Sequence, residues 1–370
     1  MNLTDYIINH IHQHGDMPFV EYMQQALYHP QMGYYSAGLT KFGPKGDFVT
    51  APELTPLFGY TLAQQFKPIL KAVDNPQVLE FGAGSGRLCI DVLTRLEQLD
   101  ALPDEYFILE VSPNLRHRQQ EAIQQDIPHL ACRVKWLSEW PSMPLTGVVI
   151  ANEVLDAMPV HRFIRGERAL LECVISVNDN GELVEQYTPC NDDRLLTYVE
   201  ANVAKDLAPY QSEVNLFIDG WLEQCSNILG KGAMFIIDYG FPRHEFYHPD
   251  RRTGTLMCHY QHQAHSNPLA HPGEEDITAH VDFTHVAEAG VDAGFEVLGY
   301  TNQGSFLLAN GILEVLTEID DEVERVKQNQ AVKQLIQENE MGELFKVMAL
   351  TKSLDFSLNG FMLNDKRYSL

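Results

Sequence analysis

The sequence has few of the features that mark a membrane protein or a disulfide-rich protein. Its longest apolar stretches, such as LTGVVIA (145–151) and GAMFIID (232–238), are much shorter than the ~20 residues that a helix needs to cross a bilayer. Its six cysteines are scattered over 370 residues without a C-x-x-C pair. This spacing favours free thiols in a reducing compartment over a disulfide framework or a zinc site.

Basic side chains are scarce relative to acidic ones. The chain has 26 lysines and arginines against 51 aspartates and glutamates, which gives a net charge of −25. Such a surface repels a phosphate backbone, and the densest basic run, Arg251-Arg252, directly follows Asp250. We therefore expect no nucleic-acid partner, whereas a cationic partner would be attracted.

The first residues, MNLTDYIINHIHQ, carry no recognisable targeting signal. They have neither the basic start and apolar run of a signal peptide nor the arginine-rich composition of a transit peptide. The sequence therefore predicts a cytoplasmic protein without membrane contact.

From Gln77 onward, short apolar segments alternate with helical patterns. This alternation indicates an α/β fold with a mostly parallel sheet. The expected strands are 77–81, 106–111, 132–137, 146–150, 233–240, 295–301 and 345–353. The chain is expected to divide into a mainly helical and loop extension that covers the site, the sheet domain and a C-terminal tail, at 1–75, 76–353 and 354–370.

Two insertions are expected to interrupt the sheet domain. The segment at about 160–190 is predicted to form antiparallel strands with a hairpin turn at Asn180-Gly181. The segment 241–280 is rich in His, Pro and Gly and is predicted to be a long loop. Its HYQHQAH motif (259–265) includes no cysteine or well-placed acid, so a substrate-facing loop is favoured and no metal site is expected.

The motif VLEFGAGSG (78–86) places a glycine turn between a strand and a helix. Such a turn lets a ligand approach the backbone, and the helix dipole favours its anionic groups. A dinucleotide fingerprint would require glycine at 87, where this chain has Arg87. The pattern formed by Gly82, Gly84 and Gly86, with Glu80 before it, resembles the first motif of class I S-adenosylmethionine-dependent methyltransferases. A purely structural turn is the alternative.

Acidic residues follow two further strands of the expected sheet. Glu110 lies 24 residues after Gly86, near the ~20-residue interval at which a carboxylate binds ribose hydroxyls. Asn152, Glu153 and Asp156 directly follow the fourth strand. Ligands of open α/β sheets bind outside the carboxyl ends of the strands, so these residues are expected beside the transferable group. A helix start with solvent-facing acids is the alternative.

A set of motifs in order along the chain extends the resemblance to one family. They are GYYS, GDFVTAPELTPLFG, VLEFGAGSGRL, ILEVSPNLRHRQ, VVIANEVLDAMPVHRF, FIIDYG, GTLMCHYQHQ and DITAHVDFT, between about residues 5 and 352. Together they resemble the MidA family of methyltransferases, whose mitochondrial members are complex I assembly factors. Because the chain lacks a transit peptide, it resembles a bacterial member.

The resemblance implies a Rossmann-like seven-stranded sheet with an antiparallel last strand and S-adenosyl-L-methionine as cofactor. It also implies, from the mitochondrial members, dimethylation of an arginine in a protein substrate. The residues expected to bind the cofactor are Glu80, Gly82, Ala83, Gly84, Gly86, Glu110, Ser112, Leu137 and Asn152. Glu153 and Asp156, with Asp47 as a weaker third, are expected to orient a guanidinium. His161 is a candidate proton acceptor, although a structural histidine is the alternative.

Two other functions remain open at this point. The first is a methyltransferase that acts on a small molecule or on RNA, of which RNA is disfavoured by the acidic charge. The second is a cofactor-binding assembly chaperone whose contacts with a client protein matter more than chemistry.

Overall fold

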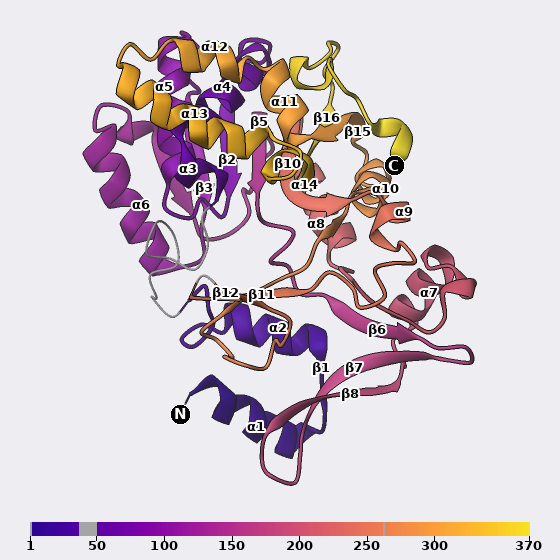
Figure 1. Cartoon of the computed structure of the whole chain (residues 1–370). Coiled ribbons are helices and arrows are strands. Elements are labelled where there is room, and N and C mark those ends of the chain that lie inside the picture. Colours follow the sequence, from indigo (N-terminus) through magenta and orange to yellow (C-terminus); the bar gives the residue numbers. More distant parts are fainter. Residues whose placement is uncertain (1, 37–49, 262) are drawn as a thin grey trace.

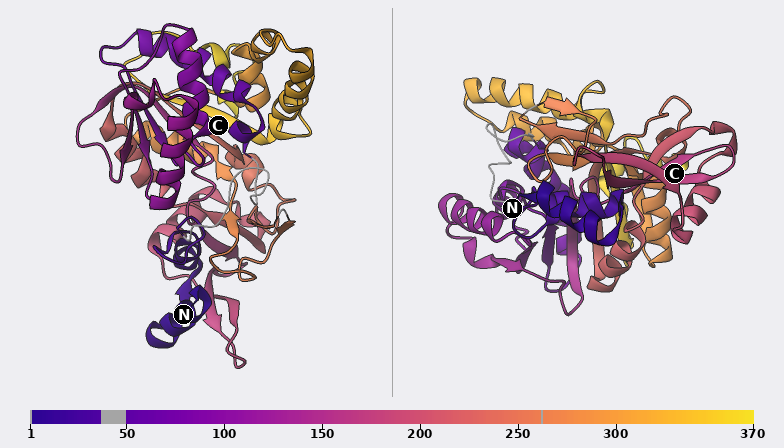
Figure 2. Two further views of the ribbon diagram at one scale, coloured as in Figure 1. Left: turned by 90° about the vertical axis from the view of Figure 1, so that its left-hand side faces the viewer. Right: turned by 90° about the horizontal axis from the view of Figure 1, so that it is seen from below.

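A computed structural model describes residues 2–36, 50–261 and 263–370. It divides into an upper part built on one large sheet and a lower part built on a smaller one (Figure 1). Figure 2 shows that the two parts stack end to end, with the N-terminus in the lower part. None of the described helices is long and apolar enough to span a bilayer.

The large sheet confirms the expected Rossmann-like architecture with seven strands. In spatial order they are β4 (Val134–Leu137), β3 (Glu105–Leu109), β2 (Gln77–Phe81), β5 (Leu145–Asn152), β10 (Leu229–Phe241), β16 (Phe345–Lys352) and β15 (Glu296–Asn302). The first five are parallel, whereas β16 runs antiparallel to both of its neighbours. A short strand, β14 (Val281–Asp282), extends the sheet at the end of β10.

Helices cover both faces of this sheet, so nearly every side chain of β2, β5, β10 and β16 is buried. On one face, the apolar sides of α4, α5, α6, α11, α12 and α13 form one core. On the other face, α8 and α10 form a second core with the sheet. These helices are α4 (Pro56–Lys71), α5 (Arg87–Gln98), α6 (Pro113–Asp126), α8 (Ile218–Ile228), α10 (Phe283–Asp292), α11 (Gln303–Ala309), α12 (Ile312–Thr317) and α13 (Glu322–Ile336).

The lower part is built on a second, antiparallel sheet, which contains the predicted hairpin. Its path is β1 (Met17–Pro18), β7 (Leu170–Val177), β6 (His161–Arg165) and β9 (Tyr210–Val214), with β8 (Leu183–Pro189) paired to β7. The turn between β7 and β8 contains Asn180 and Gly181, whose φ is 79°. Against this sheet pack α1 (Leu3–His14), α2 (Phe19–Tyr28) and α7 (Asp193–Asn202).

The segment 241–280 differs from the predicted long loop. It forms a three-stranded antiparallel sheet of β12 (Gln263–His265), β11 (Met257–Tyr260) and β13 (Asp276–Thr278). The pairing of β11 with β13 joins residues almost 20 positions apart, and such pairing leaves no local sequence signal. The described residues also form three four-residue α-helices, namely α3 (Ala51–Leu54), α9 (Arg243–Phe246) and α14 (Met341–Leu344).

The two halves of the first 75 residues have different neighbours. Helices α1 and α2 pack against the second sheet, whereas α4 packs on the large sheet beside α5. Thr55 caps α4, since its Oγ1 accepts a hydrogen bond from the Leu57 amide at 3.1 Å. After α2 the chain turns back, and the amides of Tyr34 and Tyr35 donate to the carbonyls of Ala26 and Leu27. The first 75 residues therefore provide helices to both sheets.

Candidate active site

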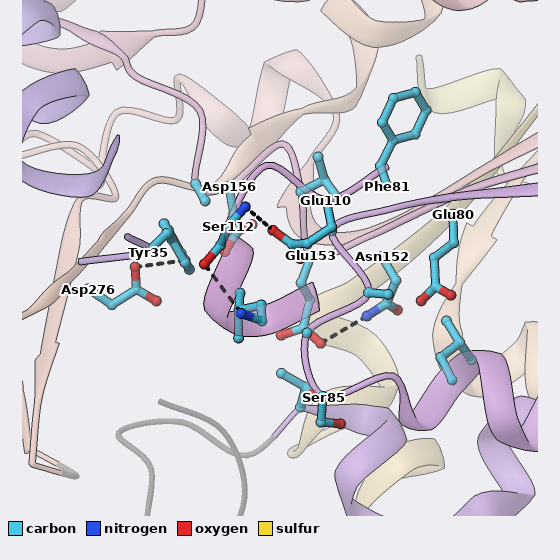
Figure 3. A pocket seen from close by; sticks show the side chains of 18 of the residues that line it. Tyr35, Glu80, Phe81, Ser85, Glu110, Ser112, Asn152, Glu153, Asp156 and Asp276 are labelled. Carbon is cyan, nitrogen blue, oxygen red and sulfur yellow. Dashed lines mark hydrogen bonds between the residues drawn. The ribbon is translucent and has the colours of Figure 1, made fainter. Parts of the chain in front are cut away.

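The candidate site is a cavity of about 350 Å³ at the carboxyl ends of β2, β3 and β5. Its walls come from the large sheet, from the end of α2 and the turn after it, from α3, and from β11 and β13. Figure 3 shows side chains of these elements turned toward one space. The crossover topology of the parallel sheet places a cavity at this edge.

The glycine turn forms the cavity wall beside β2. Gly82, Ala83 and Gly84 line the cavity, and the two glycines have φ values of 60° and 52°. Gly86, with φ 86°, begins α5 and does not line the cavity; a Cβ there would lie 3.4 Å from the Gln119 side chain. These left-handed conformations explain why glycine occupies positions 82, 84 and 86 of the turn.

Glu110, directly after β3, is held by two donors. Its Oε1 accepts from the Ser112 amide at 2.9 Å and its Oε2 from Gln119 Nε2 at 3.0 Å (Figure 3 shows the first). Burial raises the pKa of Glu110, and these hydrogen bonds partly oppose that effect. Ser112 also lines the cavity. Leu137, by contrast, is not among the described lining residues, and its carbonyl accepts a hydrogen bond from the Glu110 amide at 3.2 Å.

Gln119 is a residue that the sequence did not predict. Its Nε2 donates to the Gly84 carbonyl at 3.0 Å as well as to Glu110, and its Oε1 accepts from Trp136 Nε1 at 2.9 Å. It therefore joins the glycine turn to the acid after the next strand. A glutamine in a glutamine-rich helix gives no pattern from which this role could be inferred.

Glu80 lies within β2 and is almost completely buried. The Tyr106 hydroxyl donates to its Oε2 at 2.7 Å. Burial raises the pKa of Glu80 to about 7, with the Tyr106 hydrogen bond opposing the rise. The burial of this carboxyl group therefore favours its neutral form more than in an exposed glutamate.

The turn after β5 carries Asn152 and Glu153. The Glu153 backbone has a φ of 53°, and its amide donates to the Ile237 carbonyl at 2.9 Å. Asn152 Nδ2 donates to Glu153 Oε1 at 3.2 Å (Figure 3), whereas the buried Asn152 Oδ1 has no hydrogen-bond partner among the described residues. A buried acceptor without a partner is costly, so it indicates a ligand group at this place. Burial, and then the charge of Asp156, raise the pKa of Glu153 to about 8.

Asp156 is held through residues of β10. Its Oδ2 accepts from the Tyr239 hydroxyl at 2.5 Å, and its buried Oδ1 has no partner within the described part of the chain. Asp238, which is fully buried, accepts from the amides of Leu155 and Asp156 at 3.0 and 3.2 Å. Burial raises the pKa of both aspartates. Residues of β10 therefore hold the acidic turn in place, whereas Asp156 Oδ1 can still accept a hydrogen bond from a ligand.

Tyrosines from the N-terminal region form the opposite wall. The rings of Tyr28 and Tyr35 stack with centroids 5.5 Å apart. The Tyr28 hydroxyl donates to the Ala157 carbonyl, and the Tyr35 hydroxyl donates to Asp276 Oδ1, both at 2.9 Å (Figure 3 shows the second). The extension and β13 thereby complete the cavity, and both contain motifs, GYYS and DITAHVDFT, that had been singled out in the sequence.

Carboxylates dominate the charges that line this cavity. The described acidic lining residues are Glu53, Glu80, Glu110, Glu153, Asp156 and Asp276. The one described lysine or arginine among the lining residues is Arg87, whose guanidinium binds Asp91 and Asp126. The cavity therefore favours a cationic ligand.

A family of proteins with this architecture matches most of the chain. The model of the S-adenosyl-L-methionine-dependent methyltransferase family matches residues 61–301, which include the glycine turn, Glu110 and the acidic turn after β5. The chain belongs to this methyltransferase family.

Solved structures and curated relatives agree with this assignment. The methyltransferase superposes with a TM-score of 0.95 on a protein from Burkholderia thailandensis that was crystallised with S-adenosyl-homocysteine, at 43% identity, covering 100% of this chain and 96% of that one. It is also similar to the mitochondrial protein arginine methyltransferase NDUFAF7. The Danio rerio protein is 27% identical over 91% of this chain and 83% of that one, and the Drosophila melanogaster homolog is 28% identical over 79% and 71%.

The cofactor of the methyltransferase is S-adenosyl-L-methionine. The residues present fit this group: a glycine turn offers open backbone, a carboxylate follows β3, and the unpartnered Asn152 Oδ1 offers an acceptor. Among the described residues, no group of three or more His, Cys, Asp or Glu side chains is arranged to hold a metal ion.

The structure does not bring His161 to the cavity of the methyltransferase. His161 begins β6, and its Nδ1 lies 3.0 Å from Glu172 Oε1 of β7. Because neither residue is among the described lining residues, a role for His161 as proton acceptor has no geometric support here. The third candidate carboxylate, Asp47, lies outside the described residues.

Proposed function

We propose that this methyltransferase transfers a methyl group to an arginine side chain of a protein substrate. The observation that carries the proposal is the carboxylate pair of Glu153 and Asp156, which shares the cavity with the tyrosine wall. The one described lysine or arginine of the lining, Arg87, is bound by Asp91 and Asp126 instead. A guanidinium is planar, cationic and rich in N–H donors, so paired carboxylates and aromatic rings suit it. The names of the NDUFAF7 relatives as protein arginine methyltransferases support the same substrate class.

We further propose how the cofactor is held. Gly82, Ala83 and Gly84 would contact it through the backbone, Glu110 would accept hydrogen bonds from its ribose hydroxyls, and Asn152 Oδ1 would accept a hydrogen bond from it. Gln119 would act through Glu110, since it orients that carboxylate. The bound cofactor supplies a methyl group made electrophilic by its sulfonium sulfur.

The acidic turn would orient the guanidinium and receive its proton. Asp156 is fixed by Tyr239 and presents Oδ1, which can accept from a guanidinium N–H. Burial and Asp156 raise the pKa of Glu153 to about 8, but Glu153 is ionised when a guanidinium lies beside it, because the opposite charge lowers that pKa. Once the nitrogen carries a methyl group, it must lose a proton, and the ionised Glu153 carboxylate is a general base that can accept that proton.

The proposal is tested by asking which residue type receives the methyl group. Purified protein and S-adenosylmethionine labelled in the methyl group are incubated with protein extract from cells that lack this gene, so that acceptor sites are unmethylated. The protein fraction is then hydrolysed and its amino acids are separated. We expect the label in methylated arginine, with Glu153→Gln reducing incorporation by about 100-fold or more.

Other outcomes would contradict the proposal. Label in a small molecule, or in another amino acid, would establish a methyltransferase with a different acceptor. Tight binding of S-adenosyl-homocysteine without transfer to any fraction would support the assembly-chaperone alternative. Glu80→Gln is the comparison variant for Glu153→Gln, because it also removes a carboxyl group but on the glycine-turn side of the cavity.

A further inference from the structure

A second cavity, of about 510 Å³, lies between α2 of the lower part and α8 of the upper part. It is mostly apolar, and its described lining residues are Gln24, Tyr28, Met158, Pro159, Arg194, Leu216, Phe217, Gly220, Trp221 and Gln224. We refer to it as the α2–α8 groove. Figure 1 shows these two helices in different parts of the molecule, so the groove exists only because the two parts meet.

The α2–α8 groove adjoins the candidate active site. Tyr28 lines both cavities, and its hydroxyl binds the Ala157 carbonyl at 2.9 Å. Asp156 and Ala157 line the active-site cavity, whereas the next residue, Met158, lines the groove. One tyrosine ring and one turn of chain therefore separate the two spaces.

The α2–α8 groove combines an apolar floor with polar groups. Trp221 forms part of the floor, and its ring lies 5.4 Å from that of Phe81, the residue before the glycine turn. Phe217 is 48% exposed and lines the groove, so its aromatic ring is accessible to a ligand there. Gln24 and Gln224 are exposed and offer amide groups that can bind a peptide backbone. An apolar space with a few polar groups is typical of a site for a side chain of a ligand.

We propose that the α2–α8 groove receives an apolar side chain that neighbours the target arginine in the substrate protein. This rests on the proposed function, because the groove shares Tyr28 with the cavity that would hold the arginine and so lies within reach of the residues that flank it. The shared wall at Tyr28, and the step from Ala157 in one lining to Met158 in the other, favour a segment of the substrate over a second copy of the chain or a free apolar ligand. The methyltransferase would thus recognise an arginine together with a nearby leucine-like or aromatic residue.

The test uses short fluorescent peptides and measures binding directly by anisotropy in the presence of S-adenosyl-homocysteine. The peptides consist of glycine and serine around one arginine, with a single leucine at each of the neighbouring positions in turn. A second set replaces arginine by citrulline, which has a similar shape but no charge. We expect leucine at one or two positions to strengthen binding about ten-fold over the peptide without leucine.

A pair of matched variants assigns that gain to the groove. Phe217 stands at the start of α8 without making a side-chain cap, so Phe217→Ser removes the aromatic ring at a place where serine is well tolerated. Leu313 on α12 is similarly exposed, at 45%, and lines neither cavity, so Leu313→Ser is the control. We expect Phe217→Ser to abolish most of the leucine gain, Leu313→Ser to keep it, and both variants to retain their affinity for S-adenosyl-homocysteine.

The outcomes separate the groove from the proposed function. If leucine gives no gain at any position, or if the gain survives in Phe217→Ser, the groove does not bind the substrate and the inference is overturned. If citrulline peptides bind as well as arginine peptides while the leucine gain still depends on Phe217, arginine specificity fails and the groove stands. A dimer seen by sedimentation that Phe217→Ser dissociates would assign the groove to a second copy of the chain, against our inference.

Discussion

The substitution Glu153→Gln tests the electrostatic description of the site without needing a substrate. Glutamine has the size of glutamate and keeps an oxygen that can accept from Asn152, but it does not titrate. Any pH-dependent contribution of Glu153 to stability therefore disappears in the variant, while the fold is retained. The same variant is expected to lose methyl transfer and to keep its affinity for S-adenosyl-homocysteine within a few-fold.

The sign and size of the effect follow from the raised pKa. Burial and the nearby Asp156 raise the pKa of Glu153 from 4.5 to about 8. Between these values the folded protein keeps a proton that the unfolded chain has released, so the free energy of unfolding falls as the pH rises. The full shift corresponds to about 5 kcal/mol, at about 1.4 kcal/mol per pKa unit. Because Glu153 lines the cavity and is only partly buried by its surface exposure, we expect about 2–4 kcal/mol to be observed.

Urea unfolding, followed by tryptophan fluorescence from pH 5 to pH 9, measures this effect. The stabilities of wild type and Glu153→Gln should be similar near pH 5, and the variant should become the more stable protein as the pH approaches 9. Glu167→Gln, at an exposed glutamate between β6 and β7, is the matched control and should follow the wild type. If the curves of Glu153→Gln and wild type run parallel over the whole range, Glu153 does not titrate in the way that the geometry requires.

Four further substitutions test individual residues of the site. Gly84→Val places a side chain on a left-handed backbone at the cavity wall and should abolish the heat of S-adenosyl-homocysteine binding in calorimetry. Gln119→Leu removes a donor from Glu110 and should weaken the same binding about ten-fold, while an unchanged affinity would exclude this role. Tyr239→Phe removes the hydrogen bond that lowers the pKa of Asp156 and should move the acid limb of the kcat/KM profile about one unit upward. His161→Gln should leave kcat/KM within about two-fold, and a loss of about 100-fold would restore the histidine to the mechanism.

The sequence predicted those parts of the site that local pattern and topology determine. A glycine turn between a strand and a helix is visible in nine residues, and the acids after the next strands are placed by the shared carboxyl edge of a parallel sheet. For this reason the structure brings Gly82, Gly84, Glu110, Asn152 and Asp156 to one cavity. The seven-stranded sheet with an antiparallel last strand followed from the family resemblance rather than from periodicity, whereas the spatial order of the strands is a finding of the structure.

The remaining parts depend on contacts between distant segments. Tyr35 and Asp276 are 241 positions apart and meet in one hydrogen bond, and Asp156 binds Tyr239 across 83 positions. Neither pairing has a local signature, because each partner is an ordinary polar residue in its own segment. The three-stranded sheet in 241–280 has no local signature for the same reason, although the DITAHVDFT motif, which begins with β13, contributes to the family resemblance. The short sequence distance between His161 and the acidic turn was also misleading, because His161 belongs to β6 in the second sheet.

The energetics of the acidic turn argue that it is built for a ligand. Asp238 and Asp156 are buried beside each other with raised pKa values, and no lysine or arginine of the described cavity lining is available to neutralise them. Such an arrangement destabilises the folded protein, since buried charge without a partner is costly. It becomes favourable when a cation enters, because the unused oxygen of Asp156 then gains a donor and Glu153 can ionise. A site whose carboxylates gain hydrogen bonds and an opposite charge from a guanidinium would bind that group in preference to a neutral one. The citrulline peptides measure this difference in affinity.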